Sequence, residues 1–403
     1  MQVTIGNAPS GKSPSNKKAS HVYDYAVIGS GLAGLALASA ISKVTNNVLL
    51  IESSDSFGGL NRAIKTPFGS LNNGLRFLPE NDLAQKAIAF LEMLLSTSLS
   101  PQSVERPPIA YESGGLRPFV GFGNHPPTFY DEISYFTHSR SLKTKLDIHE
   151  WTPLLFEQFS GEFLAKSYVT KFHQEEKRIT YITVNGQKTI HAQNFIYCGP
   201  VKALKNLLPE NLLSSKSLQK LSKNQYWTAV GLDLLHGHAV SALENIHVLN
   251  GTTQDEIGPC VWTFQAPVEV AGERLQSSQW LTFIDDEEAE DTDIVGASLK
   301  KVKRQIKRAY PNAFENLKFE RILVVPSFSG DGDLKLSANQ TLPGAENLWI
   351  GSTQVNTQKN ILGALLQAEL VASALGCHPL GNQVQVSTES NTDSSSQALQ
   401  ENL

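Results

Sequence analysis

The 403-residue chain is poor in cysteine and has no long apolar run. Its three cysteines, Cys198, Cys260 and Cys377, are far apart and odd in number. This spacing argues against a disulfide framework and against a paired-cysteine metal site, so we expect a reducing compartment. No stretch approaches the roughly 18 consecutive apolar residues that span a bilayer, and the N-terminus lacks the order of a secretory signal. We therefore expect a cytoplasmic protein without integral membrane association.

The chain also lacks an excess of charge of one sign. It has 34 Lys and Arg against 39 Asp and Glu, a net charge of −5. Such a balance produces no broad basic field that would draw the protein onto phosphate backbones, so nucleic acid is not an expected partner. With 40% hydrophobic and 18% charged residues, the composition is that of a globular protein long enough for two domains.

Both ends of the chain are polar. Residues 1–21 are rich in Ser and Lys and lack Arg, which favours a disordered tail over an organelle-targeting segment, although the second reading stays open. Residues 380–403 are low-complexity sequence that cannot bury a core, and we expect a second disordered tail there.

A glycine-rich turn follows the first apolar run. In "YDYAVIGSGLAGLALASAISKVTNNVLLIES", the composition of Val22–Ile28 is typical of a buried parallel strand, and residues 35–43 have helical spacing. Between them stands G-x-G-x-x-G, and Val48–Ile51 predicts a second buried strand that Glu52 ends. The order strand, glycine turn, helix, strand and acid is the arrangement of a dinucleotide-binding unit.

Each residue type in this motif has a physical role. Gly29 permits the sharp turn, Gly31 lets the backbone approach a pyrophosphate, and Gly34 allows close packing of helix on strand. The backbone N–H groups at the helix start are expected to hold the phosphates, with Ser30, Leu32 and Ala33 beside the glycines. Glu52, followed by Ser53, is placed to accept ribose hydroxyls, which disfavours NADP. The alternative is a glycine-rich turn that holds nothing.

A second glycine pair follows in "SSDSFGGLNRA". With this pair, Gly58 and Gly59, the chain resembles the flavin-containing amine oxidase, protoporphyrinogen oxidase and phytoene desaturase superfamily. The resemblance implies bound FAD and an α/β fold: a Rossmann-like FAD-binding domain, made of a parallel sheet with a β-meander, plus a mixed α+β substrate domain. That family usually has Arg directly after the glycine pair, whereas this chain has Leu60. Arg62 is a candidate for the missing phosphate contact, and the alternative is an ordinary exposed arginine.

Three later segments carry the same resemblance in order. "GSLNNGLRFLPEND" (69–82) implies that Asn73 and Gly74 lie near the ribityl chain and flavin ring. Residues 163–208 resemble the returning β-meander, with Val169 where the backbone pairs with adenine. Residues 346–375 resemble the last strand and closing helix. In this last segment the resemblance assigns cofactor contacts to Gly351, Ser352, Asn360 and Ile361.

The resemblance divides the chain into two domains. Residues 22–78, 163–208 and 339–379 are assigned to the FAD-binding domain, and residues 79–162 and 209–338 to the substrate domain. Within the latter, residues 82–95 predict a helix with an apolar face at positions 83, 87, 88, 91, 94 and 95. Residues 106–130 suit loops more than a sheet. Strands are expected at 226–235, 259–267 and 279–285, a helix at 294–310, and a loop after Pro326.

The sequence of the expected substrate domain does not indicate a catalytic base. Arg76 is the candidate catalytic residue, either holding a substrate carboxylate or bracing the flavin, and a structural ion pair is the alternative. Lys335 is a candidate for the lysine that many amine-oxidising relatives place near the flavin. Trp262 and Phe264 could wall the pocket, although core packing is favoured. His236 and His238 could ligate a metal from one side of a strand, but further ligands are not evident, so we expect no metal site.

The sequence thus predicts an FAD-dependent oxidase or dehydrogenase that takes a hydride from a C–N or C–C bond of a small to medium organic substrate. The stretch before the last strand looks more like the protoporphyrinogen oxidase and desaturase branch, which favours a biosynthetic step. One alternative is a non-redox flavin-dependent mutase or isomerase. Another is a flavin-binding protein that has lost catalysis, suggested by the missing arginine.

Overall fold

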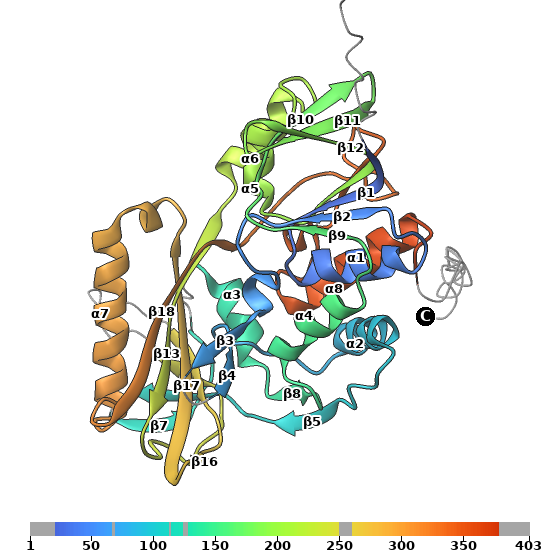
Figure 1. Cartoon of the computed structure of the whole chain (residues 1–403). Helices are drawn as coiled ribbons and strands as arrows, with labels where there is room; N and C mark the ends of the chain where they lie inside the picture. The colour runs from blue at the N-terminus through green and yellow to red at the C-terminus, as the bar shows by residue number, and fades with distance from the viewer. Residues whose placement is uncertain (1–20, 67–68, 113, 124–127, 250–259, 379–403) are drawn as a thin grey trace, which may run out of the picture.

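The structure is a computed structural model that describes residues 21–66, 69–112, 114–123, 128–249 and 260–378. Apart from His21, the two expected tails lie outside the described residues. Two large sheets are joined by a layer of helices and loops (Figure 1). No helix in the described ranges is long and apolar enough to cross a membrane.

The first sheet has seven strands in the order β10-β11-β12-β1-β2-β9, with β19 beside β12. Parallel pairing joins β19, β12, β1, β2 and β9, while β10, β11 and β12 form an antiparallel meander. The prediction of a Rossmann-like α/β unit with a β-meander is confirmed. The strand bounds are Val22–Ile28 (β1), Val48–Ile51 (β2), Glu162–Leu164 (β9), Val169–Glu175 (β10), Arg178–Val184 (β11), Lys188–Tyr197 (β12) and Leu348–Ile350 (β19).

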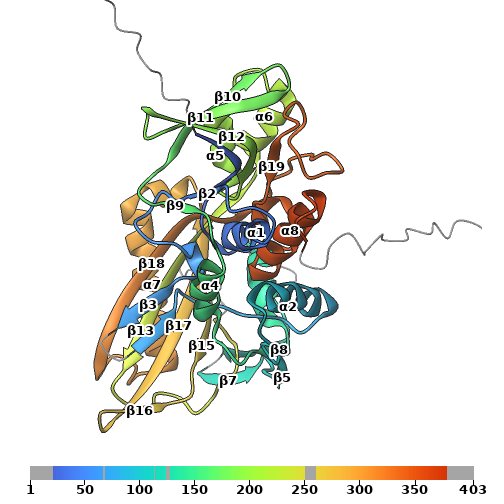
Figure 2. The same ribbon diagram turned by 45° about the vertical axis from the view of Figure 1, so that its right-hand side comes forward.

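Four helices cover one face of this sheet. They are α1 (Leu32–Ser42), α2 (Asp82–Leu95), α4 (Ile148–Glu157) and α8 (Ile361–Ala374). Helices α1 and α8 lie side by side in both views and share one buried cluster with α2 and α4 (Figures 1 and 2). Helix α1 starts at Leu32, earlier than predicted. Although α2 and α4 fall within the expected substrate segment, they pack against α1, so the domain division stays a prediction.

The predicted core-facing stripe of α2 was wrong at one position. Leu83 is 39% exposed, whereas Ala84 is buried. Position 84 lies four and seven residues before Ile88 and Leu91, so it shares their face of the helix. Asn81 is the N-cap of this helix, and its side chain accepts a hydrogen bond from the backbone N–H of Ala84 at 2.8 Å.

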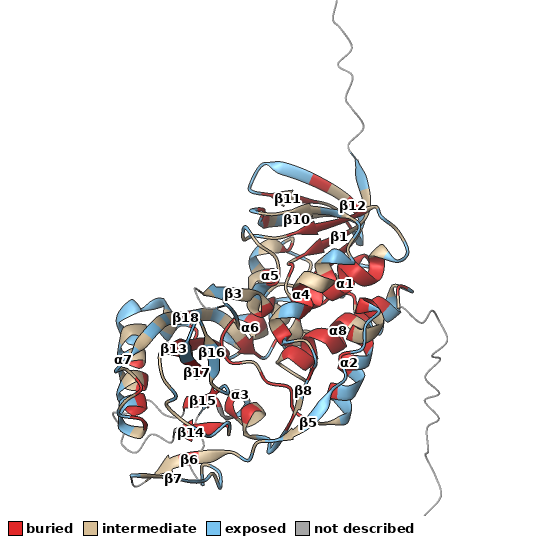
Figure 3. Cartoon of the chain, turned by 60° about the horizontal axis from the view of Figure 1, so that its bottom comes forward, coloured by how far each residue is buried: buried red, intermediate tan, exposed pale blue. Residues whose placement is uncertain are grey.

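The second large sheet has eight strands in the order β18-β13-β17-β15-β14-β6-β7, with β16 beside β17. Helix α7 (Thr292–Ala309) covers one face, and its inward side is buried (Figure 3). The predicted strands and helix of this region are confirmed. The strand bounds are Ile109–Glu112 (β6), Gly115–Pro118 (β7), Tyr226–His236 (β13), His247–Leu249 (β14), Cys260–Phe264 (β15), Val268–Val270 (β16), Glu273–Asp285 (β17) and Leu317–Gly330 (β18).

Two expectations for this sheet were wrong. Residues 106–130 are not all loop, because β6 and β7 form a hairpin that adds to the sheet through parallel pairing of β6 with β14. Pro326 does not precede a loop but lies inside β18. The register between β13 and β18 shifts between Trp227 and Ala229, opposite this segment, and Ser327 has a φ of 49°. A bulge tolerates the missing proline N–H, which a regular ladder would not.

The remaining elements are short. Two-stranded sheets pair β3 (Ala63–Thr66) with β4 (Gly69–Asn72) and β5 (Gln102–Glu105) with β8 (Arg140–Lys143). The other helical segments are α3 (Tyr130–Ser134), α5 (Val201–Leu207), α6 (Ser215–Lys223), η1 (Gly59–Asn61), η2 (Tyr135–Thr137), η3 (Glu288–Glu290) and η4 (Thr353–Val355).

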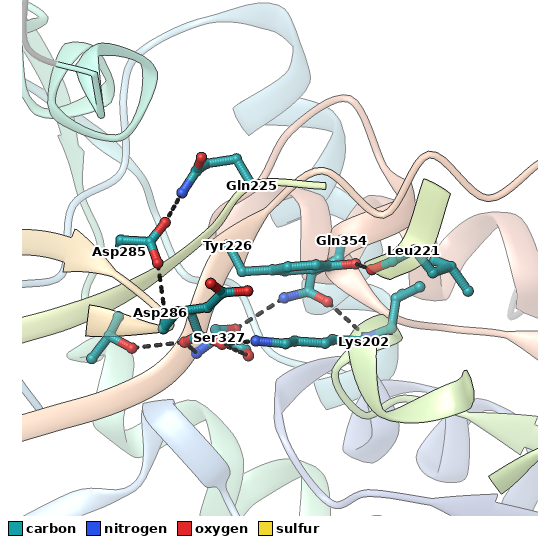
Figure 4. Close-up of polar contacts among 11 residues, drawn as sticks. Lys202, Leu221, Gln225, Tyr226, Asp285, Asp286, Ser327 and Gln354 are labelled. Atoms are coloured by element: carbon teal, nitrogen blue, oxygen red, sulfur yellow. Dashed lines mark hydrogen bonds and ion pairs between the residues drawn. The ribbon is translucent and has the colours of Figure 1, made fainter. Parts of the chain in front are cut away.

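A buried carboxylate ties the eight-stranded sheet to helix α5, which follows β12 of the seven-stranded sheet (Figure 4). Asp286, at the end of β17, accepts hydrogen bonds at 2.7 Å from the ammonium of Lys202 on α5 and from the hydroxyl of Thr228 on β13. The backbone N–H of Ser327 on β18 donates a third bond at 2.7 Å. Burial by itself would raise the pKa of Asp286, but these bonds more than offset that effect and lower the pKa to about 2.

Candidate active site

The carboxyl ends of four parallel strands meet at one edge of the seven-stranded sheet. The register aligns their last residues, which are Ile51 (β2), Ile28 (β1), Tyr197 (β12) and Ile350 (β19). The residues that follow them at this edge are Glu52, Gly29, Cys198 and Gly351. Ligands of open parallel sheets bind beyond the carboxyl ends of the strands, so this edge is the expected nucleotide site.

The glycine turn between β1 and α1 has the geometry of a phosphate cradle. A methyl group added to Gly34 would lie 1.8 Å from the carbonyl oxygen of Gly29, so only glycine allows this helix to pack on the turn. A methyl group on Gly31 would meet nothing within 4 Å, so open space lies beside this residue. Helix α1 has no side-chain cap and no acid in its first turn, where Leu32 and Ala33 are buried. Its first N–H groups suit an anion.

Glu52 is more deeply engaged in the protein than the sequence suggested. Its carboxylate accepts hydrogen bonds from the backbone N–H and hydroxyl of Ser30, at 2.9 Å and 2.7 Å, and from the N–H of Ser54 at 2.8 Å. The hydroxyl of Ser53 donates a further bond at 3.1 Å. Burial would raise the pKa of Glu52, but the hydrogen bonds from Ser54 and Ser30 outweigh it and lower the pKa. Ribose hydroxyls of a bound nucleotide would donate to the Glu52 carboxylate beside, or in place of, the hydroxyls of Ser30 and Ser53.

The second glycine pair covers the turn. The backbone N–H of Gly58 donates to the carbonyl of Ser30 at 2.9 Å. A methyl group on Gly59 would lie 3.1 Å from the Cα of Gly31, so the two loops are in close contact. The Arg62 guanidinium donates to the hydroxyl of Ser56 at 3.3 Å. A phosphate contact from Arg62 stays a prediction.

The same loop continues into a cavity of about 680 Å³ between the eight-stranded sheet and the start of α8. Leu60 and Asn61 line it on one side, and the start of α8 contributes Asn360 and Ile361. Sheet and loop segments supply an aromatic wall made of Phe77, Tyr135, Phe136, Phe283 and Phe328. The rest of the lining includes polar and charged side chains, among them Arg76, Glu132 and Lys359. An apolar wall with polar groups that can orient a ligand is the usual form of a small-molecule site.

Arg76 lies at this cavity and braces the loop. Its Nε and one terminal nitrogen donate to the carbonyl oxygen of Leu60 at 3.2 Å and 2.6 Å, and the other nitrogen donates to Leu75 at 3.0 Å. The guanidinium carbon stands 5.7 Å from the ring centre of Phe328. Burial lowers the pKa of Arg76, partly offset by Asp233, and leaves it cationic at neutral pH. Arg76 thus braces the loop backbone, and its contact with flavin or substrate stays a prediction.

Asn61 carries a buried polar atom that a ligand would satisfy. The residue is 8% exposed, and its side-chain oxygen has no hydrogen-bond partner among the described residues. A buried acceptor without a donor is costly, so an N–H or O–H group of a ligand is expected there. Together with the uncapped start of α1 and the space beside Gly31, this atom makes the site compatible with an elongated dinucleotide such as FAD.

The start of α8 differs in one respect from the expectation. Asn360 is the N-cap of the helix and Ile361 is its first residue, as predicted. The side chain of Asn360 caps the helix by accepting hydrogen bonds from Leu362 and Gly363 at 2.9 Å and 3.4 Å. The helix N-terminus is therefore already partly satisfied, and the cofactor contact of this pair stays a prediction.

Other predicted cofactor residues do not line the cavity. The side-chain oxygen of Asn73 accepts from Arg321 at 2.6 Å, beneath the eight-stranded sheet, and a methyl on Gly74 would lie 2.6 Å from a side-chain carbon of Leu323. Val169 is a buried residue that opens β10. Gly351 and Ser352 follow β19 and are buried, and their cofactor contacts stay a prediction.

Several candidates lie away from the cavity. Lys335 is exposed and does not line it. Trp262 stacks on Trp280 at 4.2 Å in the core under α7, and Phe264 belongs to the same cluster, so the core-packing interpretation is confirmed. The imidazole of His236 bonds to the carbonyl of Ala313 and the hydroxyl of Ser278, both at 2.8 Å.

Sequence reasoning missed most of the cavity. Glu132 and Tyr135 come from the short helical segment 130–137, Phe283 from β17 and Ser329 from β18. The aromatic run "TFYDEISYF" and the alternation of apolar residues in β17 were the available signals. Neither of these patterns shows which face of a strand lines the cavity.

Comparisons with known proteins agree with this arrangement. The NAD(P)-binding Rossmann-like domain family matches residues 27–93. An oxidoreductase from Methanosarcina mazei is similar in structure, with a TM-score of 0.62 and 13% identity over 87% of this chain and 99% of that one. No curated protein sequence matches the chain.

Two amine oxidases are similar as well. A cofactor-binding variant of putrescine oxidase has a TM-score of 0.63 and 12% identity, covering 89% of this chain and 99% of that one. Cyclohexylamine oxidase from Brevibacterium oxydans has a TM-score of 0.60 and 12% identity, covering 88% and 99%. At such low identity the likeness shows the fold, and the expected fold is thereby confirmed over nearly the whole length of those proteins.

Proposed function

We propose that the protein is an FAD-dependent oxidoreductase that removes a hydride from a C–N or C–C bond of a small to medium organic molecule, in a biosynthetic step. One observation carries the proposal. The loop that covers the glycine turn through Gly58 and Gly59 continues directly into the cavity through Leu60 and Asn61. A dinucleotide with its pyrophosphate at the turn would therefore extend its second half toward the cavity.

The chain supplies binding and orientation in this proposal. Bound flavin would provide the hydride acceptor. The rings of Phe283 and Phe328 would exclude water and hold the reacting C–H bond in position. Arg76 fixes the Leu60 carbonyl and with it the loop that carries Asn61, whose free oxygen accepts a donor from the ligand.

Two structural neighbours are putrescine oxidase and cyclohexylamine oxidase, and both act on amines, which supports a C–N bond as the site of oxidation. The mutase alternative finds no such support. Among the described cavity residues, the cations Arg76 and Lys359 both donate to backbone carbonyls, Arg76 to Leu60 and Lys359 to Gln354 at 2.7 Å. They are poorly placed to hold a sugar diphosphate.

Anaerobic mixing of the FAD-loaded protein with a panel of primary and secondary amines tests the proposal. Net redox chemistry predicts bleaching of the yellow flavin spectrum, which air then restores. Product without net bleaching would indicate the isomerase alternative. FAD bound tightly without bleaching or product across the panel would favour a flavin-binding protein that has lost catalysis. A parallel sample without amine controls for spontaneous reduction.

A further inference from the structure

The cavity carries a partly buried carboxylate that the proposed chemistry does not use. Glu132, on α3, lines the cavity together with Asp131 and Asp331, of which the last two are exposed. The Glu132 carboxylate accepts a hydrogen bond at 2.7 Å from the hydroxyl of Ser329, a β18 residue that is 2% exposed. The side chain is thus held in place across the cavity from a fixed strand.

Glu132 retains acceptor capacity. The Ser329 hydroxyl and the backbone N–H of Glu132 itself donate to its carboxylate. A carboxylate offers about four lone-pair positions, so a further donor can bind. Burial raises the pKa of Glu132, partly offset by the Ser329 bond, which indicates a carboxylate that gains from a cationic partner.

The two cations of the cavity, Lys359 and Arg76, contact groups other than Glu132. The Lys359 ammonium donates to the Gln354 carbonyl at 2.7 Å and lies 3.5 Å from Asp331. Arg76 is held by backbone carbonyls of the loop. The charge of Lys359 partly offsets the rise that burial causes in the pKa of Glu132. The side chains of these two described residues form no ion pair or hydrogen bond, however, so a cationic ligand can still contact Glu132 directly.

Two other features of the cavity favour a donor-bearing cation. The unpartnered side-chain oxygen of Asn61, a residue more than nine-tenths buried, belongs to the same lining and also calls for a donor. The rings of Tyr135, Phe136 and Phe283 line the cavity with apolar surface and with faces that attract cations.

We propose that Glu132, positioned by Ser329, is the specificity-determining residue that selects an organic cation, with a protonated amine and an apolar or aromatic body, over neutral molecules of the same shape. The inference rests on the proposed function, because the cavity is a substrate site only if FAD binds at the glycine turn and extends toward the cavity. It separates an amine substrate from the uncharged hydrocarbon substrates that C–C oxidation would also allow.

Anaerobic calorimetric titration of the full-length, FAD-loaded protein with benzylammonium and with benzyl alcohol, after the flavin has been reduced with dithionite, tests the proposal. Reduced flavin cannot accept a hydride, so binding is measured without turnover. Wild-type protein should bind the cation at least about tenfold more tightly than the alcohol, a difference of about 1.4 kcal/mol. Glu132→Gln should abolish that preference while leaving the affinity for the alcohol within about twofold. Ser329→Ala should reduce the preference by a smaller factor.

Asp131→Asn is the matched control, because it removes one neighbouring, exposed carboxylate and should change the preference less than about threefold. Equal binding of the two probes by wild-type protein, binding of neither, or equal effects of Glu132→Gln and Asp131→Asn would overturn the proposal. If Glu132→Gln does not fold, Ser329→Ala decides, and an unchanged preference there counts against the proposal. FAD content is measured separately on each sample, so loss of the cofactor is distinguished from loss of selectivity.

Discussion

The carboxylate of Glu52 accepts hydrogen bonds from both the backbone N–H and the hydroxyl of Ser30, at 2.9 Å and 2.7 Å. The acid at the end of β2 is therefore joined to the glycine turn at the end of β1. This contact fixes the turn whether or not a ribose is bound. It gives Glu52 a structural role beside the expected nucleotide contact.

Replacing Glu52 by alanine should lower both stability and FAD affinity. The N–H groups of Ser30 and Ser54 would lose their acceptor, at a cost of about 1–3 kcal/mol for each group that stays buried and unpaired. We expect a lower melting temperature without cofactor and at least about tenfold weaker FAD binding, measured by thermal unfolding and fluorescence titration. Asp55→Ala, at an exposed position of the same loop, is the control. Equal effects of the two substitutions would contradict the role of Glu52.

The glycines of the turn make a matched pair. Gly34→Ala places a methyl group 1.8 Å from the Gly29 carbonyl oxygen, so we expect a loss of several kcal/mol of stability or no folded protein. Gly31→Ala meets no protein atom within 4 Å and should leave the stability of the cofactor-free protein nearly unchanged. It should nevertheless weaken FAD binding at least about tenfold, because the methyl occupies the space of the pyrophosphate. Undiminished FAD binding by Gly31→Ala would place the pyrophosphate elsewhere.

Asp286 should make the junction between the eight-stranded sheet and α5 sensitive to acid. Its pKa is lowered to about 2 from the model-peptide value of 3.8, so its contribution is fully present above about pH 4 and is lost as the pH falls toward 2. The shift corresponds to about 2 kcal/mol. Urea unfolding at a series of pH values should show this loss in wild-type protein and a smaller one in Asp286→Asn. Asp285→Asn, next along the chain, should keep the wild-type slope, and a shared slope in all three would refute the assignment.

Two buried histidines should also make the free energy of unfolding depend on pH, in a range above that of Asp286. Burial lowers the pKa of His236 and of His247 to about 4 from 6.5. The unfolded chain therefore binds more protons between these values, and each histidine should remove up to about 3 kcal/mol of stability as the pH falls from about 6.5 to 4. Substitution of either residue by Gln should flatten the pH dependence of the unfolding free energy. The exposed His138 serves as control, and an unaltered slope after substitution of His236 or His247 would contradict their burial as neutral rings.

Local sequence patterns were enough to predict the first strand, glycine turn and helix of the seven-stranded sheet. The strand Val22–Ile28 and the glycine turn follow from residues that are neighbours in the chain, whereas the start of α8 at Asn360 was implied by the family resemblance. Turn chemistry and capping act over a few residues, so they leave a readable signal.

The lining of the cavity and part of the eight-stranded sheet depend on contacts between distant segments. The hairpin of β6 and β7 is set by parallel pairing with β14, and Glu132 meets Ser329 only because α3 and β18 face each other across the cavity. Lys335 is exposed, as lysine side chains usually are, although it was a candidate for a lysine near the flavin. Packing between such segments decides the cavity lining, and periodicity within each segment does not determine it.

Titration of the cofactor-stripped protein with FAD, followed by gel filtration, tests the central claim most directly, because the claim is that the glycine turn and the cavity share one flavin dinucleotide. We predict a yellow protein that retains one FAD per chain through the column, with the bound flavin responding to benzylammonium. A colourless protein after incubation with FAD would contradict the account.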